Sequence, residues 1–203
     1  MLLKAKEKKE RALGTKLFLK GERCNSPKCA MIRRPYKPGM HGKKRRSVSD
    51  FGLQLREKQK IQLTFGLNNR QIGKMFKELA VKGTMSGHDI LNLLERRLDN
   101  VVFRLGFASS RIKARQLVGH GHFLVNGRKV TIPSYQVRIG DKITIRKTPL
   151  SKVFEGLPTY LKKYEPPTWL NIDADKLAGE VVALPQESEA HLNPNLVLEY
   201  FSR

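Results

Sequence analysis

The sequence predicts an α+β fold, with a mostly helical domain built from the N- and C-terminal parts and a second domain inserted between them. Apolar residues recur at helical spacing in the middle of the chain, where Ile90, Leu94 and Leu98 begin one stripe. The dipeptide Asn126-Gly127 stands between two short apolar runs and is a strong β-hairpin signal, because both residues tolerate a positive φ. We therefore expect the inserted domain to consist of short helices followed by a β-hairpin or small sheet.

Residues 1–48 are predicted to form a basic, loop-rich N-terminal arm. Glycines and prolines break any long helix here, and they stand at Gly14, Gly21, Pro27, Pro35, Pro38, Gly39 and Gly42. The apolar island at residues 17–19 is too small for a core of its own. We expect the arm to become ordered only against a partner.

Three helices are expected after the arm, over about 49–65, from 68 or 69 to a stop at Gly83, and from 86 onward. Serine and asparagine side chains accept hydrogen bonds from the free N–H groups of a first helical turn, and the candidate caps are Ser47 or Ser49, Asn68 or Asn69, and Ser86. The third helical stretch carries one apolar stripe, formed by Ile90, Leu94, Leu98, Val101 and Leu105.

The remaining elements follow from caps, turns and apolar runs. Ser109 or Ser110 caps a short helix that ends at Gly119 or Gly121, and strands are expected at about 122–125, 128–132 and 142–147. Beyond Pro149 we expect two strands, around 169–172 and 181–184, and a final helix with Asn193 as cap and Pro194 at its first position. The predicted domains are 1–48, 49–88 together with 150–203, and the inserted 89–149.

The charge of the chain is large and uneven. The formal net charge is +22; residues 1–50 carry +12, residues 51–150 carry +13, and residues 151–203 carry −3. Such an excess attracts phosphate by electrostatics and counterion release, and it exceeds what solubility requires. We predict a polyanionic partner. No apolar window reaches the length of a membrane span, and the first residues do not resemble a signal or transit peptide, so we expect a cytoplasmic protein without membrane contact.

Basic side chains gather on the predicted inserted domain. Arg111 and Arg115 are four residues apart and share one helical face, where a bound phosphate would offset their mutual repulsion. The alternative for one such helix is a solvated basic face, but further cations nearby favour binding of structured RNA by shape and phosphate position. These are Arg96, Arg97, Arg104, Lys113, His120, Arg128 and Lys129.

Two N-terminal motifs allow more than one interpretation. The run Lys43-Lys44-Arg45-Arg46 fits a targeting tag or solvated linker as well as a grip on single-stranded or junction RNA. Cys24 and Cys29 are half of the four-ligand set that structural zinc needs, and we favour two free thiols in a reducing compartment.

Signals for an enzyme are few. Arg97-Leu98-Asp99 is similar to a catalytic triplet of pseudouridine synthases, but we place it within a helix, where Asp99 can pair with an arginine. No P-loop, HExxH or GxSxG motif is present. The competing hypotheses are a structural RNA-binding protein, an RNA-modifying enzyme, a free RNA chaperone and a DNA-binding protein; we favour the first.

Residues 93–141, LLERRLDNVVFRLGFASSRIKARQLVGHGHFLVNGRKVTIPSYQVRIGD, resemble the RNA-binding domain of ribosomal protein S4. The stretches LGTKLFLKGERCNSPKCAMIRRPYKPGMHG, SDFGLQLREKQKIQLTFGLNNRQIG and PPTWLNIDADKLAGEVVALP resemble other parts of the same bacterial-type family. The resemblance covers residues from about 13 to 203. It implies a structural constituent of the small ribosomal subunit, a monomer within the ribonucleoprotein, and no enzyme.

The resemblance also implies a role in translation and a set of contacts. The family binds small-subunit rRNA and nucleates assembly of the subunit body at a five-way helix junction. It lines the mRNA entry channel beside ribosomal proteins three and five, where Lys44 and Arg45 match basic positions, and it influences accuracy. Zinc-binding members carry four N-terminal cysteines, whereas this chain has two, so no zinc cofactor is expected. The basic N-terminal region and eight further residues would face RNA: Arg96, Arg97, Arg111, Lys113, Arg115, His120, Asn126 and Arg128.

Overall fold

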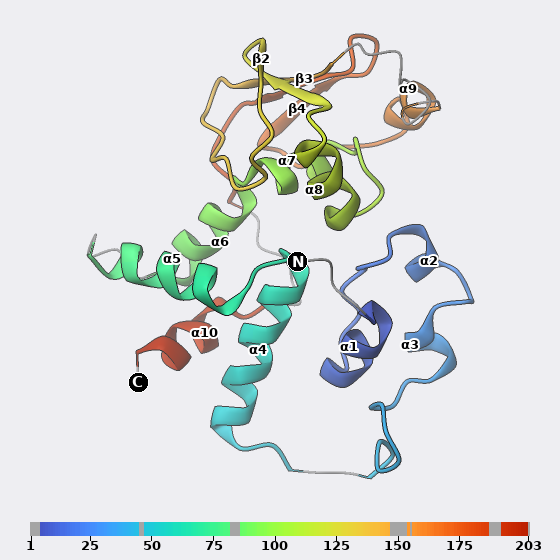
Figure 1. The fold of residues 1–203 in the computed structure, drawn as a ribbon, viewed down its shortest axis with the longest axis vertical. Coiled ribbons are helices and arrows are strands. Elements are labelled where there is room, and N and C mark those ends of the chain that lie inside the picture. The colour runs from blue at the N-terminus through green and yellow to red at the C-terminus, as the bar shows by residue number, and fades with distance from the viewer. Residues whose placement is uncertain are drawn as a thin grey trace. The chain divides into compact units, whose positions relative to one another are not determined.

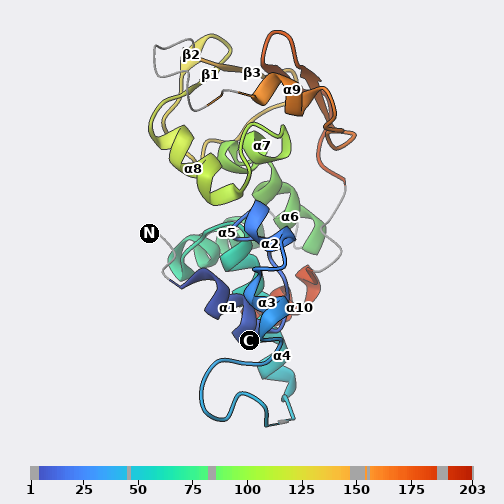
Figure 2. The ribbon, with the colours of Figure 1, turned by 90° about the vertical axis from the view of Figure 1, so that its right-hand side faces the viewer.

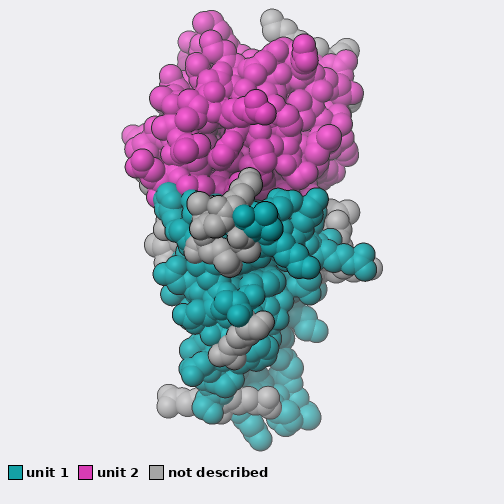
Figure 3. Space-filling model, turned by 90° about the vertical axis from the view of Figure 1, so that its left-hand side faces the viewer, with its two compact units in different colours: residues 1–91, 188–203 teal, residues 92–187 magenta. Residues whose placement is uncertain are grey.

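The protein consists of two compact units, coloured separately in Figure 3. Unit 1 comprises residues 1–91 and 188–203, and unit 2 comprises residues 92–187. The structure, a computed structural model, describes residues 5–44, 47–81, 86–146, 154, 156–186 and 192–202. Helices and a small antiparallel sheet together confirm the α+β class.

The sheet of unit 2 has five strands in the order β2-β1-β3-β5-β4, and every neighbouring pair is antiparallel. The hairpin between β1 and β2 turns at Asn126 and Gly127, whose φ angles are 50° and 78°, as a type I′ turn requires. The predicted hairpin is therefore confirmed. The strands are β1 (Phe123–Val125), β2 (Arg128–Lys129), β3 (Lys142–Ile145), β4 (Leu170–Asp173) and β5 (Ala178–Val181).

Strands β4 and β5 belong to unit 2, whereas the sequence analysis grouped residues 150–203 with the helical domain. Strand β5 pairs with β3 in the register Ile143↔Gly179 and so extends the sheet begun by the hairpin. The strand also packs closely against the Leu105 side chain, because a Cβ added at Gly179 would lie 2.5 Å from it. Joining this sheet buries Leu170 and Val181, which a separate two-stranded ribbon would leave exposed.

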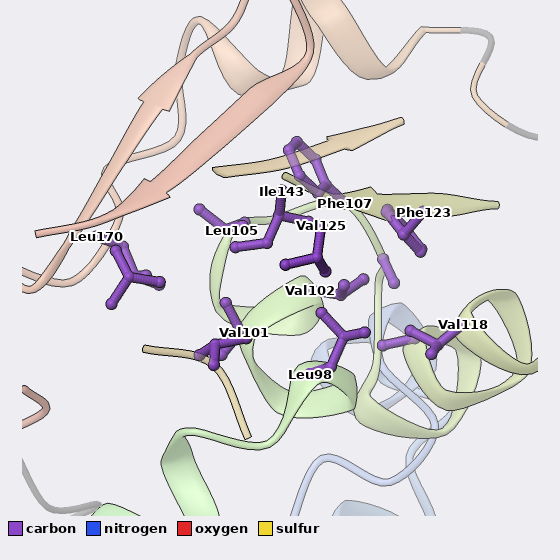
Figure 4. Packing of buried hydrophobic residues seen from close by; sticks show 14 of the residues in the cluster. Leu98, Val101, Val102, Leu105, Phe107, Val118, Phe123, Val125, Ile143 and Leu170 are labelled. Carbon is purple, nitrogen blue, oxygen red and sulfur yellow. The ribbon is translucent and has the colours of Figure 1, made fainter. Parts of the chain in front are cut away.

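Helices α7 (Leu98–Arg104) and α8 (Arg111–Gly119) pack together beside the sheet of unit 2 (Figure 1). The expected Ser110 cap is present, since its hydroxyl oxygen accepts a hydrogen bond from the Lys113 N–H at 3.3 Å. Figure 4 shows how apolar side chains from both helices meet those of the strands in one core. Its fully buried members include Leu98, Val101, Val102, Leu105, Val118, Phe123 and Ile143.

The predicted apolar stripe is buried, but two helices carry it. Helix α6 (Gly87–Glu95) ends before Arg96, and α7 begins at Leu98. Arg97 lies between them in an extended conformation and forms an isolated β-bridge with Gln136. The expectation that Arg97-Leu98-Asp99 lies within a helix was therefore wrong, because the loop around Gln136 competes for the backbone of Arg97.

Unit 1 contains the helices α4 (Asp50–Thr64), α5 (Asn69–Val81) and α10 (Pro194–Phe201). Their predicted caps are confirmed: side-chain oxygens of Ser49, Asn68 and Asn193 accept hydrogen bonds from N–H groups of the first turns. The rings of Phe76 and Phe201 stack at 4.2 Å between centroids, which joins α5 to α10. The expected stop of the second helix at Gly83 lies outside the described residues.

The N-terminal segment contains more helix than expected, with three helices drawn in blue in Figure 2: α1 (Lys6–Leu13), α2 (Glu22–Asn25) and α3 (Ala30–Arg33). Two residues of the apolar island are buried, with Leu17 and Leu19 exposing 3% and 4% of their surface. The helix over residues 6–13 escaped prediction because its sequence, KEKKERAL, has a strongly polar composition. Among the described helices none is long and apolar enough to span a membrane.

Candidate nucleic-acid interface

The basic surface of unit 2 begins where the chain passes from α6 to α7. The backbone N–H groups of Leu98 and Asp99 donate to the carbonyl oxygens of Tyr135 and Pro133, at 2.9 and 3.2 Å. The Arg96 Nε donates to the Val137 carbonyl oxygen at 3.0 Å. The loop over residues 133–137 therefore satisfies the free donors at the start of α7 and fixes this end of the helix.

A buried carboxylate organises the next part of the surface. Glu95, which is 2% exposed, accepts hydrogen bonds from Arg104 Nε and Nη2 at 3.0 and 2.8 Å. It also accepts one from Asn100 Nδ2 at 2.6 Å, and Arg111 Nη2 lies 4.0 Å from it. Two arginines from different helices thus share a single buried anion.

Asp99, at the start of α7, is a second buried carboxylate that holds arginines. Its two carboxylate oxygens accept hydrogen bonds from Arg97 Nε and Nη2, at 3.1 and 2.8 Å, and Arg115 Nη1 lies 3.9 Å away. The predicted pairing of Asp99 with a neighbouring arginine is confirmed. Because Arg97 is only 4% exposed, its guanidinium supports the surface from beneath instead of presenting a face to a ligand.

The Arg111 side chain contacts Glu95, Asn100 and Phe103. Its Nε donates to Asn100 Oδ1 at 2.7 Å, and its guanidinium carbon lies 4.6 Å from the centre of the Phe103 ring. Tyr164 supports the same region by donating from its hydroxyl to the Arg104 carbonyl oxygen at 3.0 Å. Burial raises the pKa of Tyr164, aided by nearby Tyr160 and opposed by the charges of Arg104 and Arg111, so the phenol remains a donor.

Two buried acids thus hold four arginines, which we name the arginine rack: Arg97, Arg104, Arg111 and Arg115. The local charge remains positive, because two carboxylates balance only two of the four guanidinium groups. Arginine keeps spare donors after one such pairing and can bind phosphate with two oxygens at once. Geometry and charge therefore both suit a phosphate-bearing ligand.

The end of α8 and the hairpin extend this surface. Lys113, His120, Arg128 and Lys129 are all exposed. The Lys129 side chain passes over Gly121, which has a φ of +74° and no Cβ to obstruct it, so the hairpin does bring a lysine beside the end of α8. Next to it, burial together with the charges of His120 and Arg146 lowers the pKa of His122.

Asn126 serves the hairpin itself. Its Nδ2 donates to Asp141 Oδ1 at 2.8 Å, and its Oδ1 accepts from the Lys142 N–H at 2.9 Å. Asp141 Oδ2 in turn accepts from the Arg138 N–H at 2.7 Å. These contacts join the turn to the loop before β3. The Asn126 amide therefore stabilises the conformation of the hairpin.

Unit 1 carries a second basic feature, an open groove of about 810 Å³ between α1, α3 and the segment that follows α3. Eight of its fourteen lining residues are Lys or Arg, and Glu7 is the single acid among them. No carboxylate within the described part of the chain forms an ion pair with the six cations other than Lys20 and Arg23, which are Lys6, Lys8, Arg11, Lys28, Arg33 and Arg34.

One wall of the groove is fixed by Arg11. Its Nε donates to the carbonyl oxygens of Arg34 and Tyr36, at 3.0 and 3.1 Å. The Lys43 ammonium lies 5.4 Å from the centre of the Tyr36 ring, and Lys43 and Lys44 are exposed. Arg45 and Arg46, the other half of the basic run, lie outside the described residues.

The two cysteines are buried inside unit 1. Cys24 and Cys29 are each 1% exposed and both thiols are free. No group of three His, Cys, Asp or Glu side chains that could hold a metal is present among the described residues, whereas structural zinc takes four ligands. Burial raises the pKa of the Cys24 thiol, an effect that Glu10 and Cys29 reinforce.

Sequence reasoning missed three parts of this surface. It singled out the cations on α7 and α8 but not Glu95 and Asn100, which position them. The motif Glu95-Arg96-Arg97-Leu98-Asp99 contains the signal, since acids interspersed with arginines predict internal pairs. The cations of α1 lie in the basic N-terminal region that was expected to face RNA, but their placement on a helix was not predicted.

Short helices that carry a fixed set of arginines beside a small sheet define a protein of the RNA-binding S4-domain class. The family model for the S4 domain matches residues 96–143, and that for the ribosomal protein S4/S9 N-terminal domain matches residues 2–95. The chain belongs to the family of small ribosomal subunit protein uS4, as the resemblance in the sequence indicated. This family is structural and non-enzymatic.

Relatives along nearly the whole chain support this assignment. The chain is 48% identical over 194 residues to small ribosomal subunit protein uS4 of Syntrophomonas wolfei, and 47% identical over 193 residues to that of Caldicellulosiruptor bescii. It is 49% identical over 195 residues to the uS4 protein of Thermus thermophilus. Each alignment covers 94% of this chain and 93% of the relative.

Proposed function

We propose that the protein, as a structural constituent of the small ribosomal subunit in the cytoplasm, nucleates assembly of the subunit body by binding a five-way junction of rRNA helices. The arginine rack carries this proposal. Its three partly exposed members, Arg104, Arg111 and Arg115, are held by buried carboxylates before any ligand binds, so the loss of side-chain freedom on binding is reduced by about 0.5–1.5 kcal/mol for each. A fixed array recognises one spacing of phosphates, whereas flexible cations would recognise charge alone.

The spacing of cations suits folded RNA better than an isolated strand. Arg111 and Arg115 share one face of α8, and the hairpin adds Lys129 at the end of the same helix. Double-stranded RNA is recognised through its shape and its phosphates, because its deep groove hides the base edges. A junction holds several backbones at fixed angles and so offers a pattern that this surface can match.

A second contact is proposed for unit 1. The basic groove and the exposed Lys43 and Lys44 would meet further rRNA, and at the mRNA entry channel the basic run would contact mRNA beside ribosomal proteins three and five. Support comes from the charge of the groove and from the resemblance of Lys44 and Arg45 to basic positions of the family. Through these contacts of unit 1 the protein would also influence translational accuracy.

The test is binding of the purified protein to a transcript of the five-way junction and to an unrelated folded RNA of equal length, across a range of salt concentrations. Selective binding that persists at about 0.3 M salt is the expected result, since shape recognition adds to the salt-sensitive electrostatic part. Equal and steeply salt-dependent binding to both RNAs would contradict junction recognition while leaving family membership untouched.

A further inference from the structure

Glu10 of α1 is a buried acid that the RNA-binding surface does not use. Its side chain has 0% exposure. Its Oε1 accepts hydrogen bonds from the backbone N–H groups of Leu17 and Leu19, at 3.2 and 3.1 Å. Its Oε2 is also buried, and the described residues provide it with no hydrogen-bond partner. A buried carboxylate that binds only backbone donors stabilises the conformation of the backbone segment that carries those donors.

The loop that Glu10 holds has an unusual backbone. Gly14 and Phe18 adopt φ angles of 72° and 54°, and this left-handed region is unfavourable for a residue other than glycine. The turn directs Leu17 and Leu19 into the interior while Phe18 remains 45% exposed. Because both N–H groups point to one oxygen, the carboxylate selects this conformation over a relaxed loop.

The surroundings of Glu10 link the loop to the two cysteines. The thiol of Cys24 is close enough for the charge of Glu10 to affect its pKa, and Glu7 and Lys16 are the other charged groups that act on Glu10. On the outer side of α1, Glu7 forms ion pairs with Lys20 at 3.2 Å and with Arg23 at 2.9 Å. Helix α1 therefore holds the following segment from two sides.

We propose that Glu10 is the internal anchor of the N-terminal segment, and that as a hydrogen-bond acceptor it organises residues 14–29 without a metal ion. This chain offers two buried thiols and no third metal ligand beside them among the described residues. One acceptor oxygen on two backbone donors replaces the cross-link that a metal would provide.

Hydrogen exchange on the full-length protein tests this proposal, because it reports on the amides of Leu17 and Leu19 directly. The variants are Glu10→Ala, Glu10→Gln and, as a matched control one turn away on the same helix, Glu7→Gln. We expect exchange at residues 17 and 19 to be at least about tenfold faster in Glu10→Ala, because both donors lose their partner. The other two variants should retain protection, since an amide oxygen still accepts both bonds and Glu7 binds neither donor.

A second experiment tests metal independence on the unaltered protein, to which either EDTA or one equivalent of zinc is added. It requires no substitution. Exchange at residues 14–29 should not change in either case. Unchanged protection in Glu10→Ala would overturn the anchor, and equal loss in Glu10→Gln would overturn its action as an acceptor. Stoichiometric zinc in the purified protein, together with faster exchange in EDTA, would overturn metal independence.

Discussion

Arg104 and Glu95 form a two-bond pair in which the arginine Nε and Nη2 donate to opposite oxygens of a buried carboxylate, at 3.0 and 2.8 Å. Asn100 donates to the same carboxylate at 2.6 Å and accepts from Arg111 at 2.7 Å. One buried anion therefore positions side chains from α7 and α8. The fold and the binding surface depend on the same group.

Glu95→Ala should lower the free energy of unfolding by about 2–4 kcal/mol, because it leaves Arg104 and Asn100 without their buried acceptor. Urea denaturation followed by circular dichroism measures the change. Glu180→Ala is the control, since Glu180 is 44% exposed in its pair with Lys142 at 3.9 Å and should shift stability by less than about 0.5 kcal/mol. Similar losses in both variants would contradict a special position for Glu95.

The double change Arg111→Ala and Arg115→Ala should weaken binding to the five-way junction by about tenfold or more. It should also make the slope of log K against log salt shallower by about 1.4–1.8, the value for two lost phosphate contacts. Filter binding across salt gives both quantities, and circular dichroism checks the fold. Lys176→Ala, at an exposed lysine paired with Asp173, is the control. An unaltered slope with unaltered affinity would remove both arginines from the interface.

Gly127→Val should lower the free energy of unfolding by about 1–2 kcal/mol through the backbone alone, since its φ of 78° suits a β-branched residue poorly. No atom lies within 4 Å of an added Cβ, so a steric clash does not contribute. Thermal unfolding measures the change. Gly127→Asn should cost clearly less, because asparagine tolerates this conformation; equal effects of both substitutions would point to a cause other than φ.

The raised pKa of Glu10 predicts that the stability of the folded protein depends on pH. Burial raises its pKa, aided by Glu7 and opposed by the N–H groups of Leu19 and Leu17 and by Lys16. The folded protein therefore holds this proton more tightly than the unfolded chain, and the resulting stability is lost as the pH rises from the ordinary value of 4.5 through the raised pKa. Glu10→Gln should be at least as stable as the parent at pH 7, and the difference should shrink toward pH 4. Thermal unfolding at both pH values tests it, and lower stability of the variant at pH 7 would contradict the sign.

The features that could be predicted from the sequence are those decided by near neighbours. Ser49, Ser110 and Asn193 cap their helices because the donors they bind lie only two or three residues away. The Asn126-Gly127 turn has the same local origin. The cations of α8 were likewise predictable, since their spacing alone assigns them to a face.

The features that were missed depend on distant partners. Arg97 interrupts the helical stripe because Gln136, far along the chain, pairs with its backbone. Strand β5 joins β3 because the edge of the hairpin sheet is available, which no local pattern reveals. The burial of Glu10 could not be predicted either, because its two donors are presented by a loop with left-handed residues.

The pairing of β3 with β5, and of α4 with α10, also bears on how the chain folds during its own synthesis. Gln54 Nε2 donates to Glu199 Oε2 across 145 positions, and Phe76 stacks on Phe201. Strand β5 likewise completes a sheet begun much earlier in the chain, at β1. A nascent chain therefore cannot close the core of unit 1 until α10 has left the exit tunnel. Loss of α10 would expose the Phe76 ring of α5 and leave a product prone to aggregation.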